Sequence, residues 1–320
     1  MKRKILSIDG GGIKGVFAAQ ILSDIEEEYG IKLCNYFDII TGTSTGAIIA
    51  SGLALGIAAK DILNLYLEKG KDIFNGYSAK GPKRLIGLFK MGFNSKYDNK
   101  NLKKCFLEVF GEKRIGDCKT RLLIPTYNLH TGKVEIFKTA HNKNYIRDYK
   151  ERIIDVLLST TAAPTFLPAY SFSNRGRYID GGVGANNPSY IAVVEALTSC
   201  KWNAEEVCVL SVGCTDDYVK FSNNKKVNGI HVMDIISFFM RAEAQYSENI
   251  SKLLLNNERE RYIRINANIS KNECALDNVT EQALQCLIQY AKNESKKYIV
   301  EVGEIFINEP KQEFVPEYEI

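Results

Sequence analysis

The segment Thr41–Gly46 constrains this chain more than any other, because it places a serine in the pattern Gly-x-Ser-x-Gly. Residues 37–40 before it read as a short buried strand, and the apolar residues 47–55 after it read as a helix. A serine on a sharp strand-to-helix turn exposes its hydroxyl, since small neighbours leave room for a strained backbone. The helix directs its first amides and its partial positive charge at the same point. The pattern therefore predicts an exposed nucleophile at Ser44.

A similar unit precedes the serine turn. Residues 4–8 predict a strand, residues 9–12 a glycine loop, and residues 13–29 a helix whose apolar side chains recur with a period close to 3.6. Two strand–turn–helix units in succession indicate an α/β fold with a mostly parallel central sheet and helices on both faces. Residues 121–128 and 133–138 read as two further strands joined by a hairpin-like connection.

Composition excludes several classes of protein. The 320 residues are 45% hydrophobic and 25% charged, which is typical of a globular chain that buries a large core without disulfides or metals. A net charge of +4 is too small to indicate binding of DNA or RNA. The eight cysteines form no C-x-x-C pair, so we expect buried thiols in place of disulfides or zinc, and no metal or other cofactor.

We interpret residues 1–215 as the core of the fold and residues 216–320 as a mainly helical part packed on the same domain. Long helical patterns over 232–257 and 279–298 dominate the second part, and the residues from about 309 predict a flexible tail. The sequence contains no run of about 18 apolar residues and no signal-peptide core at its beginning. We therefore expect a cytoplasmic protein.

The glycine loop Asp9–Gly15 allows three interpretations. It satisfies G-x-G-x-x-G between a strand and a helix, as a dinucleotide site does. Such a site needs an acid at the end of the second strand, whereas Asp38 precedes the apolar pair that continues that strand. The loop could also be a purely structural turn. We favour converging backbone N–H groups that form an oxyanion hole beside Ser44, donated by Gly10, Gly11 and Gly12.

The serine needs a general base, and the chain has three histidines, His130, His141 and His231. None of them lies at the end of a strand framed by glycines. Only His231 could follow a triad acid in the chain order Ser, Asp, His. The histidines are therefore the weaker candidates.

Asp180 is the candidate that we favour. It ends a short strand predicted at residues 177–179, and two glycines follow it, Gly181 and Gly182, which let another segment approach its carboxylate. A carboxylate is a feeble base at its ordinary pKa near 4. Partial desolvation would raise that pKa and allow a two-member Ser–Asp dyad.

Three motifs in this order, Asp9–Gly15, Gly42–Gly46 and Asp180–Gly182, resemble those of the patatin-like phospholipase family. The segment Ala162–Pro168 is similar to the family's Ala-Ala-Pro segment, and the resemblance covers roughly residues 5–213. It implies a three-layer patatin-like fold with helical C-terminal additions, and a lipid acyl hydrolase. Carried over, Ser44 is the nucleophile, Asp180 the base, and Gly11 and Gly12 the main oxyanion donors.

Six further motif residues support these roles: Lys14, Gly15, Gly42, Gly46, Gly181 and Gly182. The chain departs from the family at Lys14, where an arginine is usual. Lysine keeps the positive charge but not the bidentate geometry. An alternative is that Lys14 simply lies on the surface of the helix.

A narrower resemblance concerns regulation. The chain, which we expect to be cytoplasmic and to have a helical C-terminal third, is similar to bacterial phospholipase effectors of anti-phage defence. A cyclic dinucleotide activates those effectors, which then degrade the membrane. This implies a cyclic di- or trinucleotide as an activator, although we find no motif that would bind it. The alternative is a catalytically silent binding or regulatory protein, and the intact Ser44 and Asp180 argue against it.

Access to membrane phospholipid requires contact with its surface. Residues 80–97 contain basic and apolar side chains and no acid, which suits peripheral contact with an anionic bilayer through Lys83, Arg84, Leu88 and Phe89. In the alternative, these apolar side chains face the core. We expect the apolar residues of 232–257 to pack in the core, with a homo-oligomer interface or part of a ligand pocket as the other interpretation. Four nearby arginines could pair with the phosphates of an activator, but we interpret them as solvated surface charges: Arg241, Arg259, Arg261 and Arg264.

Overall fold

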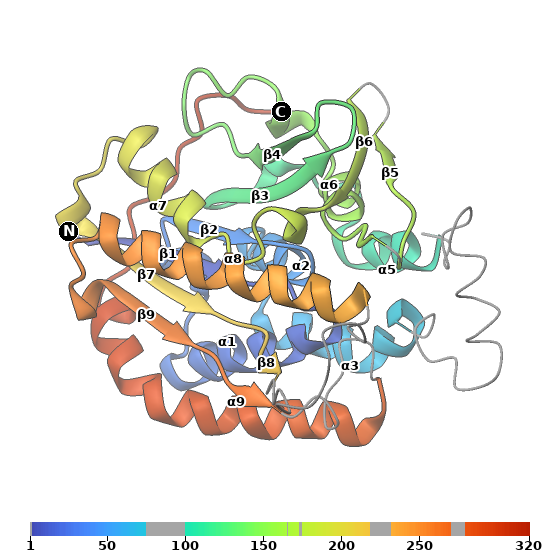
Figure 1. The fold of residues 1–320 in the computed structure, drawn as a ribbon. Coiled ribbons are helices and arrows are strands. Elements are labelled where there is room, and N and C mark those ends of the chain that lie inside the picture. The colour runs from blue at the N-terminus through green and yellow to red at the C-terminus, as the bar shows by residue number, and fades with distance from the viewer. Residues whose placement is uncertain (1, 75–99, 165, 173–174, 218–231, 270–278) are drawn as a thin grey trace.

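The computed structural model describes residues 2–74, 100–164, 166–172, 175–217, 232–269 and 279–320 (Figure 1). The four residues predicted to contact a membrane, Lys83, Arg84, Leu88 and Phe89, lie outside the described residues, and so does His231.

An eight-stranded sheet organises the fold, in the order β5-β6-β3-β2-β1-β7-β9, with β4 paired to β3. The strands β1, β2, β3, β7 and β9 are parallel, and β4, β5 and β6 run antiparallel to their neighbours. A separate short pair joins β8 to β10. The bounds are β1 Arg3–Ile8, β2 Ile39–Gly42, β3 Arg121–Asn128, β4 Lys133–Lys138, β5 Tyr170–Phe172, β6 Gly176–Asp180, β7 Val207–Val212, β8 Asp216–Asp217, β9 Tyr262–Ile265 and β10 Asn268–Ile269.

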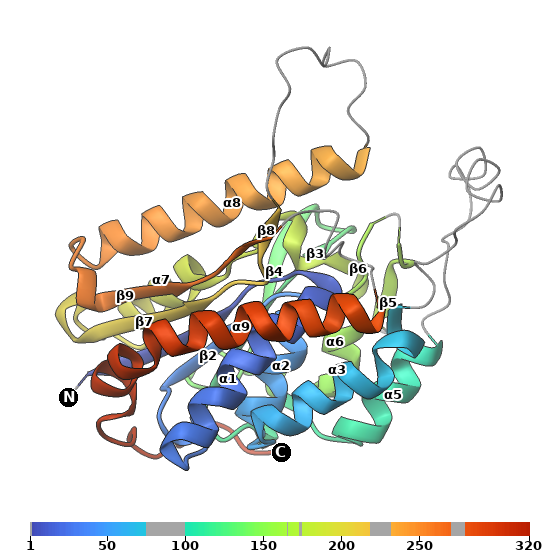
Figure 2. The ribbon, with the colours of Figure 1, turned by 90° about the horizontal axis from the view of Figure 1, so that it is seen from below.

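Helices cover both faces of this sheet (Figure 2). One face carries α1 (Gly15–Tyr29), α2 (Thr45–Ala54), α3 (Ala59–Phe74), α5 (Lys100–Phe110), α6 (Ile153–Thr160) and α9 (Glu281–Val302). The opposite face carries α7 (Ser189–Thr198), with α8 (Val232–Leu254) packed against α7. This arrangement confirms the predicted α/β fold with a largely parallel sheet between two helical layers.

The strand β1 shows how the sequence produces two buried faces. Side chains of successive strand residues point to opposite faces of a sheet. Leu6 and Ile8 therefore pack into the larger core beneath α1, while Ile5 packs with Ala192 and Val193 of α7. All three are fully buried, as expected for a parallel strand covered on both sides.

The C-terminal part of the chain adds a strand that sequence analysis missed. Strand β9 pairs in parallel with β7, with Val209 opposite Tyr262 and Ser211 opposite Arg264. Its four residues are too few to show an alternating pattern. The helix α9 packs against α1, on the face of the sheet opposite to α7 and α8.

Residues 309–320, for which the sequence predicts a flexible tail, run along the body of the protein. The backbone N–H of Lys311 donates to the carbonyl of Asn35 at 2.8 Å, and that of Glu317 to the carbonyl of Ala140 at 2.7 Å. The ring of Tyr318 stacks on Tyr149 with 5.8 Å between centroids.

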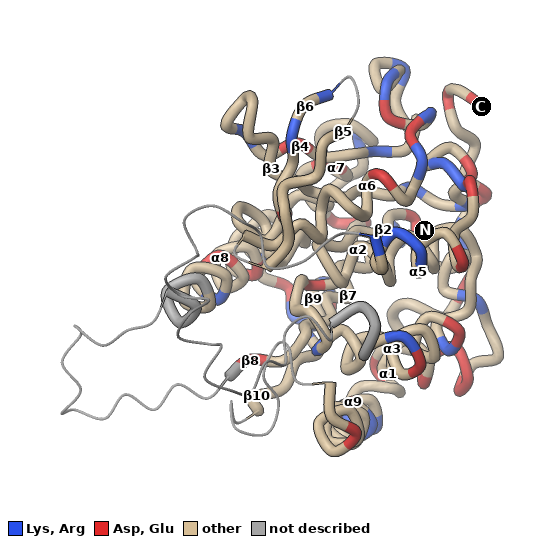
Figure 3. Tube along the Cα trace, turned by 90° about the vertical axis from the view of Figure 1, so that its right-hand side faces the viewer, with Lys and Arg blue, Asp and Glu red and all other residues tan. Residues whose placement is uncertain are grey.

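Charged residues of both signs are interspersed along the described trace (Figure 3). The cysteines in the described ranges are free thiols, and five of them are buried. None of the described helices is both long and apolar enough to span a bilayer.

Candidate active site

Ser44 occupies a sharp turn between β2 and α2. Its φ of 54° and ψ of −118° are rare for a residue with a side chain, and such strain is concentrated at functional sites. Two glycines permit the turn: a Cβ on Gly42 would lie 2.2 Å from the carbonyl oxygen of Gly46, and one on Gly46 would lie 2.3 Å from that of Ile8. These close approaches leave room for the sharp turn, and Ser44 itself is half-buried.

A threonine from a neighbouring element holds this turn. The backbone N–H of Ser44 donates to Oγ1 of Thr160 at 3.2 Å, and that hydroxyl donates to the carbonyl of Pro125 at 2.8 Å. Thr160 ends α6 and is fully buried. The turn at Ser44 is thus anchored to strand β3.

Asp180 ends β6, beside the serine turn, although 136 positions separate the two residues in the sequence. The hydroxyl of Ser44 donates to Asp180 Oδ2 at 2.6 Å. The other carboxylate oxygen accepts the backbone N–H of Gly182 at 2.7 Å. A Cβ on Gly181 would lie 2.1 Å from the carbonyl oxygen of Pro125, so the glycine after the aspartate allows its turn to approach β3 closely.

The environment of Asp180 tunes its pKa. Burial disfavours the charged form and raises the pKa to about 6, although the hydrogen bonds from Ser44 and Gly182 act in the opposite direction. In the described part of the chain, no lysine or arginine forms an ion pair with this carboxylate. A carboxylate with a pKa near 6 can accept and return a proton at neutral pH.

The described histidines lie elsewhere. His130 follows β3, where its backbone N–H donates to the side chain of Asn128. The buried ring of His141 bonds to Thr139 and Glu195 at 2.9 and 3.0 Å. Neither forms a hydrogen bond to Ser44, whose hydroxyl donates to the carboxylate of Asp180.

The glycine loop lies against Ser44. A Cβ on Gly10 would be 3.5 Å from the Cβ of Ser44. The N–H of Gly10, a predicted oxyanion donor, already donates to the carbonyl of Asn186 at 3.0 Å. The N–H groups of Gly11 and Gly12 donate to no acceptor within the described ranges. Gly12 has a positive φ of 57°, a conformation that glycine adopts without strain.

Two residues at the start of α1 support the loop. Lys14, which directly precedes α1, is 3% exposed. Its interpretation as a lysine on the helix surface is therefore wrong. A Cβ on Gly15 would lie 2.4 Å from Oγ1 of Thr45, which lets α1 pack closely against the beginning of α2.

An ion pair that the sequence did not reveal fixes the strand end before the glycine loop. Arg264 of β9 donates to both carboxylate oxygens of Asp9, at 3.0 and 2.6 Å. The Arg264 side chain is 14% exposed, which corrects its interpretation as a solvated charge. A bidentate pair of this kind restrains both partners geometrically. It links the C-terminal part of the chain to the candidate site.

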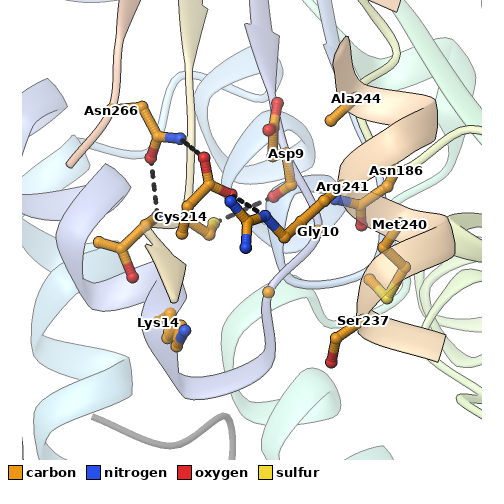
Figure 4. Close-up of a pocket in the computed structure, with 13 residues that line it drawn as sticks. Asp9, Gly10, Lys14, Asn186, Cys214, Ser237, Met240, Arg241, Ala244 and Asn266 are labelled. Atoms are coloured by element: carbon orange, nitrogen blue, oxygen red, sulfur yellow. Dashed lines mark hydrogen bonds and ion pairs between the residues drawn. The ribbon is translucent and has the colours of Figure 1, made fainter. Parts of the chain in front are cut away.

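A cleft opens beside the glycine loop, between the end of β7 and helix α8 (Figure 4). Asn186 and Met240 line it, and so does Arg241, whose guanidinium lies 4.0 Å from Asp216. Ser44 and Asp180 are not among its lining residues. Across the described residues, no group of three or more His, Cys, Asp or Glu side chains could hold a metal ion.

Comparison with protein families gives a match to the model described as patatin-like phospholipase, over residues 6–193. A cGAMP-activated phospholipase from Escherichia coli (strain TW11681) is 32% identical over 332 residues, covering 92% of this chain and 91% of that protein. A protein of the same name from Vibrio cholerae serotype O1 is 39% identical over 222 residues, which cover 65% of this chain and 62% of that protein.

More distant proteins also match. Patatin-like protein 4 from Arabidopsis thaliana is 28% identical over 320 residues, covering 86% of this chain and 78% of that protein. Among solved structures, VipD from Legionella pneumophila aligns with a TM-score of 0.50 and 16% identity, over 93% of this chain and 67% of VipD. The likeness to VipD concerns the fold alone.

Proposed function

The chain belongs to the patatin-like phospholipase family, and from that premise we propose that it hydrolyses acyl esters of membrane phospholipid with Ser44 as nucleophile and Asp180 as base. The observation that carries this proposal is the 2.6 Å hydrogen bond between a serine on a strained turn and a buried carboxylate. The alternative of a catalytically silent binding protein is disfavoured, because such a protein would have no need to keep this geometry.

The chemistry follows from the two side chains. Asp180 accepts the hydroxyl proton while Ser44 Oγ attacks the acyl carbon, and the proton then passes to the departing lysophospholipid oxygen. Water attacks the resulting acyl-enzyme, with Asp180 again as the base, and fatty acid leaves. The raised pKa of about 6 makes Asp180 a competent base in both halves of the reaction.

The oxyanion hole belongs to the same proposal. We assign it to the N–H groups of Gly11 and Gly12, since the N–H of Gly10 already bonds to Asn186. The first amides of α2 point their partial positive charge toward the same region. Loss of one such donor typically costs about 3–4 kcal/mol of transition-state stabilisation.

The proposal also includes regulation by a cyclic nucleotide. Two similar proteins carry the name cGAMP-activated phospholipase, and one of them aligns over 92% of this chain. We infer that a cyclic di- or trinucleotide activates this chain too, in a role in anti-phage defence. Peripheral membrane contact through residues 83–89 and assembly into a homo-oligomer stay predictions.

The test is release of fatty acid from vesicles of phosphatidylethanolamine and phosphatidylglycerol, with and without cGAMP. We expect release by the wild type that rises with cGAMP, and none by Ser44→Ala. Ser51→Ala, which removes a buried hydroxyl from the same helix, is the matched control and should stay active. Equal release by Ser44→Ala would reject the nucleophile. Release that cGAMP leaves unchanged would reject cGAMP as the activator and leave the hydrolase assignment intact.

A further inference from the structure

The side-chain oxygen of Asn186 lies near Ser44 and Asp180 and has no hydrogen-bond partner among the described residues. The residue is 7% exposed, and no group within the described ranges bonds to its Oδ1 atom. A buried polar group without a partner is costly, and in a native protein it calls for an explanation. An acceptor that is kept unbonded next to reacting groups indicates a partner that arrives with the reaction.

Two glycines leave room for this side chain. A Cβ on Gly10 would lie 2.6 Å from Asn186 Oδ1, and the same Cβ would be 3.5 Å from the Cβ of Ser44. The position of a Cβ on Gly182 lies 3.2 Å from Asn186 Oδ1 and 3.1 Å from Asp180 Oδ1. The amide oxygen and the carboxylate thus face the same space from two sides.

The backbone around Asn186 is fixed by other groups. Its carbonyl accepts the N–H of Gly10 at 3.0 Å, and the carbonyl of Ala185 accepts the hydroxyl of Thr43 at 2.6 Å. The next N–H, of Asn187, donates to Glu243 of α8 at 3.0 Å. The position of the Asn186 side chain is therefore set by its backbone, and its oxygen stays available.

One side of this space is apolar. The methyl group of Met240 lies 3.4 Å from the position of a Cβ on Gly182, and Figure 4 shows Met240 on α8 beside Asn186 and Gly10. A water molecule between these groups would have few hydrogen-bond partners. A buried water typically makes about three hydrogen bonds, so each available acceptor matters for holding it.

We propose that Asn186 is a further catalytic residue, whose Oδ1 accepts a hydrogen bond from the water that hydrolyses the acyl-enzyme. This rests on the proposed function of Ser44 and Asp180. The water oxygen bonds to the acyl carbon while Asp180 takes one proton, and the remaining O–H donates to Asn186. When the intermediate collapses, the bond to Ser44 Oγ breaks, the proton returns from Asp180 to that oxygen, and the fatty acid leaves.

The proposal assigns Asn186 to the second half of the reaction. The first half, attack of Ser44 on the ester, involves no water and does not need this acceptor. Replacement of Asn186 should therefore slow deacylation and spare acylation. We expect deacylation to slow roughly tenfold, which corresponds to about 1.4 kcal/mol in the barrier.

The experiment follows both halves with p-nitrophenyl butyrate, in the full chain with cGAMP present. Asn186→Ala should show a burst of p-nitrophenol followed by a steady rate roughly tenfold below that of the wild type, and an acyl adduct on Ser44 should accumulate in the intact mass. Asn186→Asp, assayed at pH 8, keeps an acceptor and should recover most of the steady rate. Rates are expressed per active site labelled by a fluorophosphonate, so that unfolded protein is not counted.

Several outcomes would overturn the proposal. If acylation and deacylation slow equally in Asn186→Ala, the residue stabilises the oxyanion or the loop. If Asn186→Asp is as slow as Asn186→Ala at pH 8, the amide acts as a donor. An unchanged steady rate in Asn186→Ala, with no acyl adduct accumulating on Ser44, means that the residue has no catalytic role. A wild type that neither hydrolyses the ester nor reacts with the fluorophosphonate would instead refute the underlying function.

Discussion

Two buried carboxylates in this protein have opposite environments. Among the described residues, Asp180 bonds only to a hydroxyl and a backbone amide, and its burial raises its pKa to about 6. Burial also acts to raise the pKa of Glu195 on α7, but bonds from His141, Lys138 and Tyr145 outweigh it and bring that pKa to about 2. Lys138 Nζ lies 2.5 Å from Glu195, and the ring Nε2 of His141 lies 3.0 Å from it.

The difference shows what converts a buried acid into a base. With a cation beside it, Glu195 stays ionised at all physiological pH values and serves as a fixed charge that joins β4 to α7. Without one, Asp180 holds its proton only loosely near neutral pH, which suits proton transfer. The one histidine ring in the described residues that pairs with a carboxylate belongs to the structural cluster and not to the dyad.

The largest expected effect comes from removing the base. Asp180→Asn should lower kcat/KM for phospholipid by a factor on the order of 10⁴, because an amide cannot take the serine proton. Glu195→Gln, measured per folded molecule, should leave kcat/KM nearly unchanged. Fatty-acid release from vesicles measures both. Activity of Asp180→Asn within tenfold of the wild type would erase the distinction between the two carboxylates.

Stability should respond in the opposite way. Glu195→Gln leaves Lys138, 18% exposed, without its carboxylate, and breaking a buried pair typically costs about 3–5 kcal/mol of unfolding free energy. Urea denaturation measures this loss. Glu108→Gln, which removes one partner of the exposed pair with Lys69, should change the unfolding free energy by less than about 1 kcal/mol. Equal losses in the two variants would show that the Glu195 cluster is dispensable.

Asp180→Asn should make the fold more stable while it abolishes activity. A pKa raised from 3.8 to about 6 means that the charged form is disfavoured in the folded state, by up to roughly 3 kcal/mol above pH 6. The asparagine variant avoids this cost. Its advantage in urea denaturation should be full at pH 7, shrink as the pH falls from about 6 to about 4, and vanish below about 4, where the wild-type carboxyl is protonated in both states. A constant difference across this range would contradict the raised pKa.

The pH dependence of activity and of folding should separate. Below pH 6, kcat/KM should fall about tenfold per pH unit as Asp180 becomes protonated. The contribution of Glu195 to stability is present above its unfolded pKa of about 4.5 and is lost only as the pH falls toward 2. Circular dichroism at pH 5 should therefore show a folded but weakly active enzyme. Coincident loss of both signals would indicate that unfolding limits the activity.

The sequence predicted the local elements of the site. The serine turn, the glycine loop and the strand end at Asp180 are each encoded within a few residues by glycines and apolar runs. The bounds of β3 and β4 match the predicted ones. Two local signals that point to one reaction type predicted that Ser44 and Asp180 share a site, and the structure brings the two side chains within hydrogen-bond distance.

Long-range pairing could not be predicted in this way. Strand β9 reaches its partner β7 through a crossover that includes the whole of α8, and nothing within Tyr262–Ile265 marks it as part of the sheet. The pairing of Arg264 with Asp9 depends on that strand and joins residues 255 positions apart. The unbonded oxygen of Asn186 likewise follows from the approach of three separate segments.

Reaction of Ser44 with a fluorophosphonate, followed as a function of pH in the wild type and in Asp180→Asn, tests the dyad most directly, because it needs neither lipid nor water. The wild-type rate should rise through an apparent pKa near 6. Asp180→Asn should react at least a hundredfold more slowly, with no such rise. Labelling of Asp180→Asn at the wild-type rate, or labelling of a residue other than Ser44, would contradict the account.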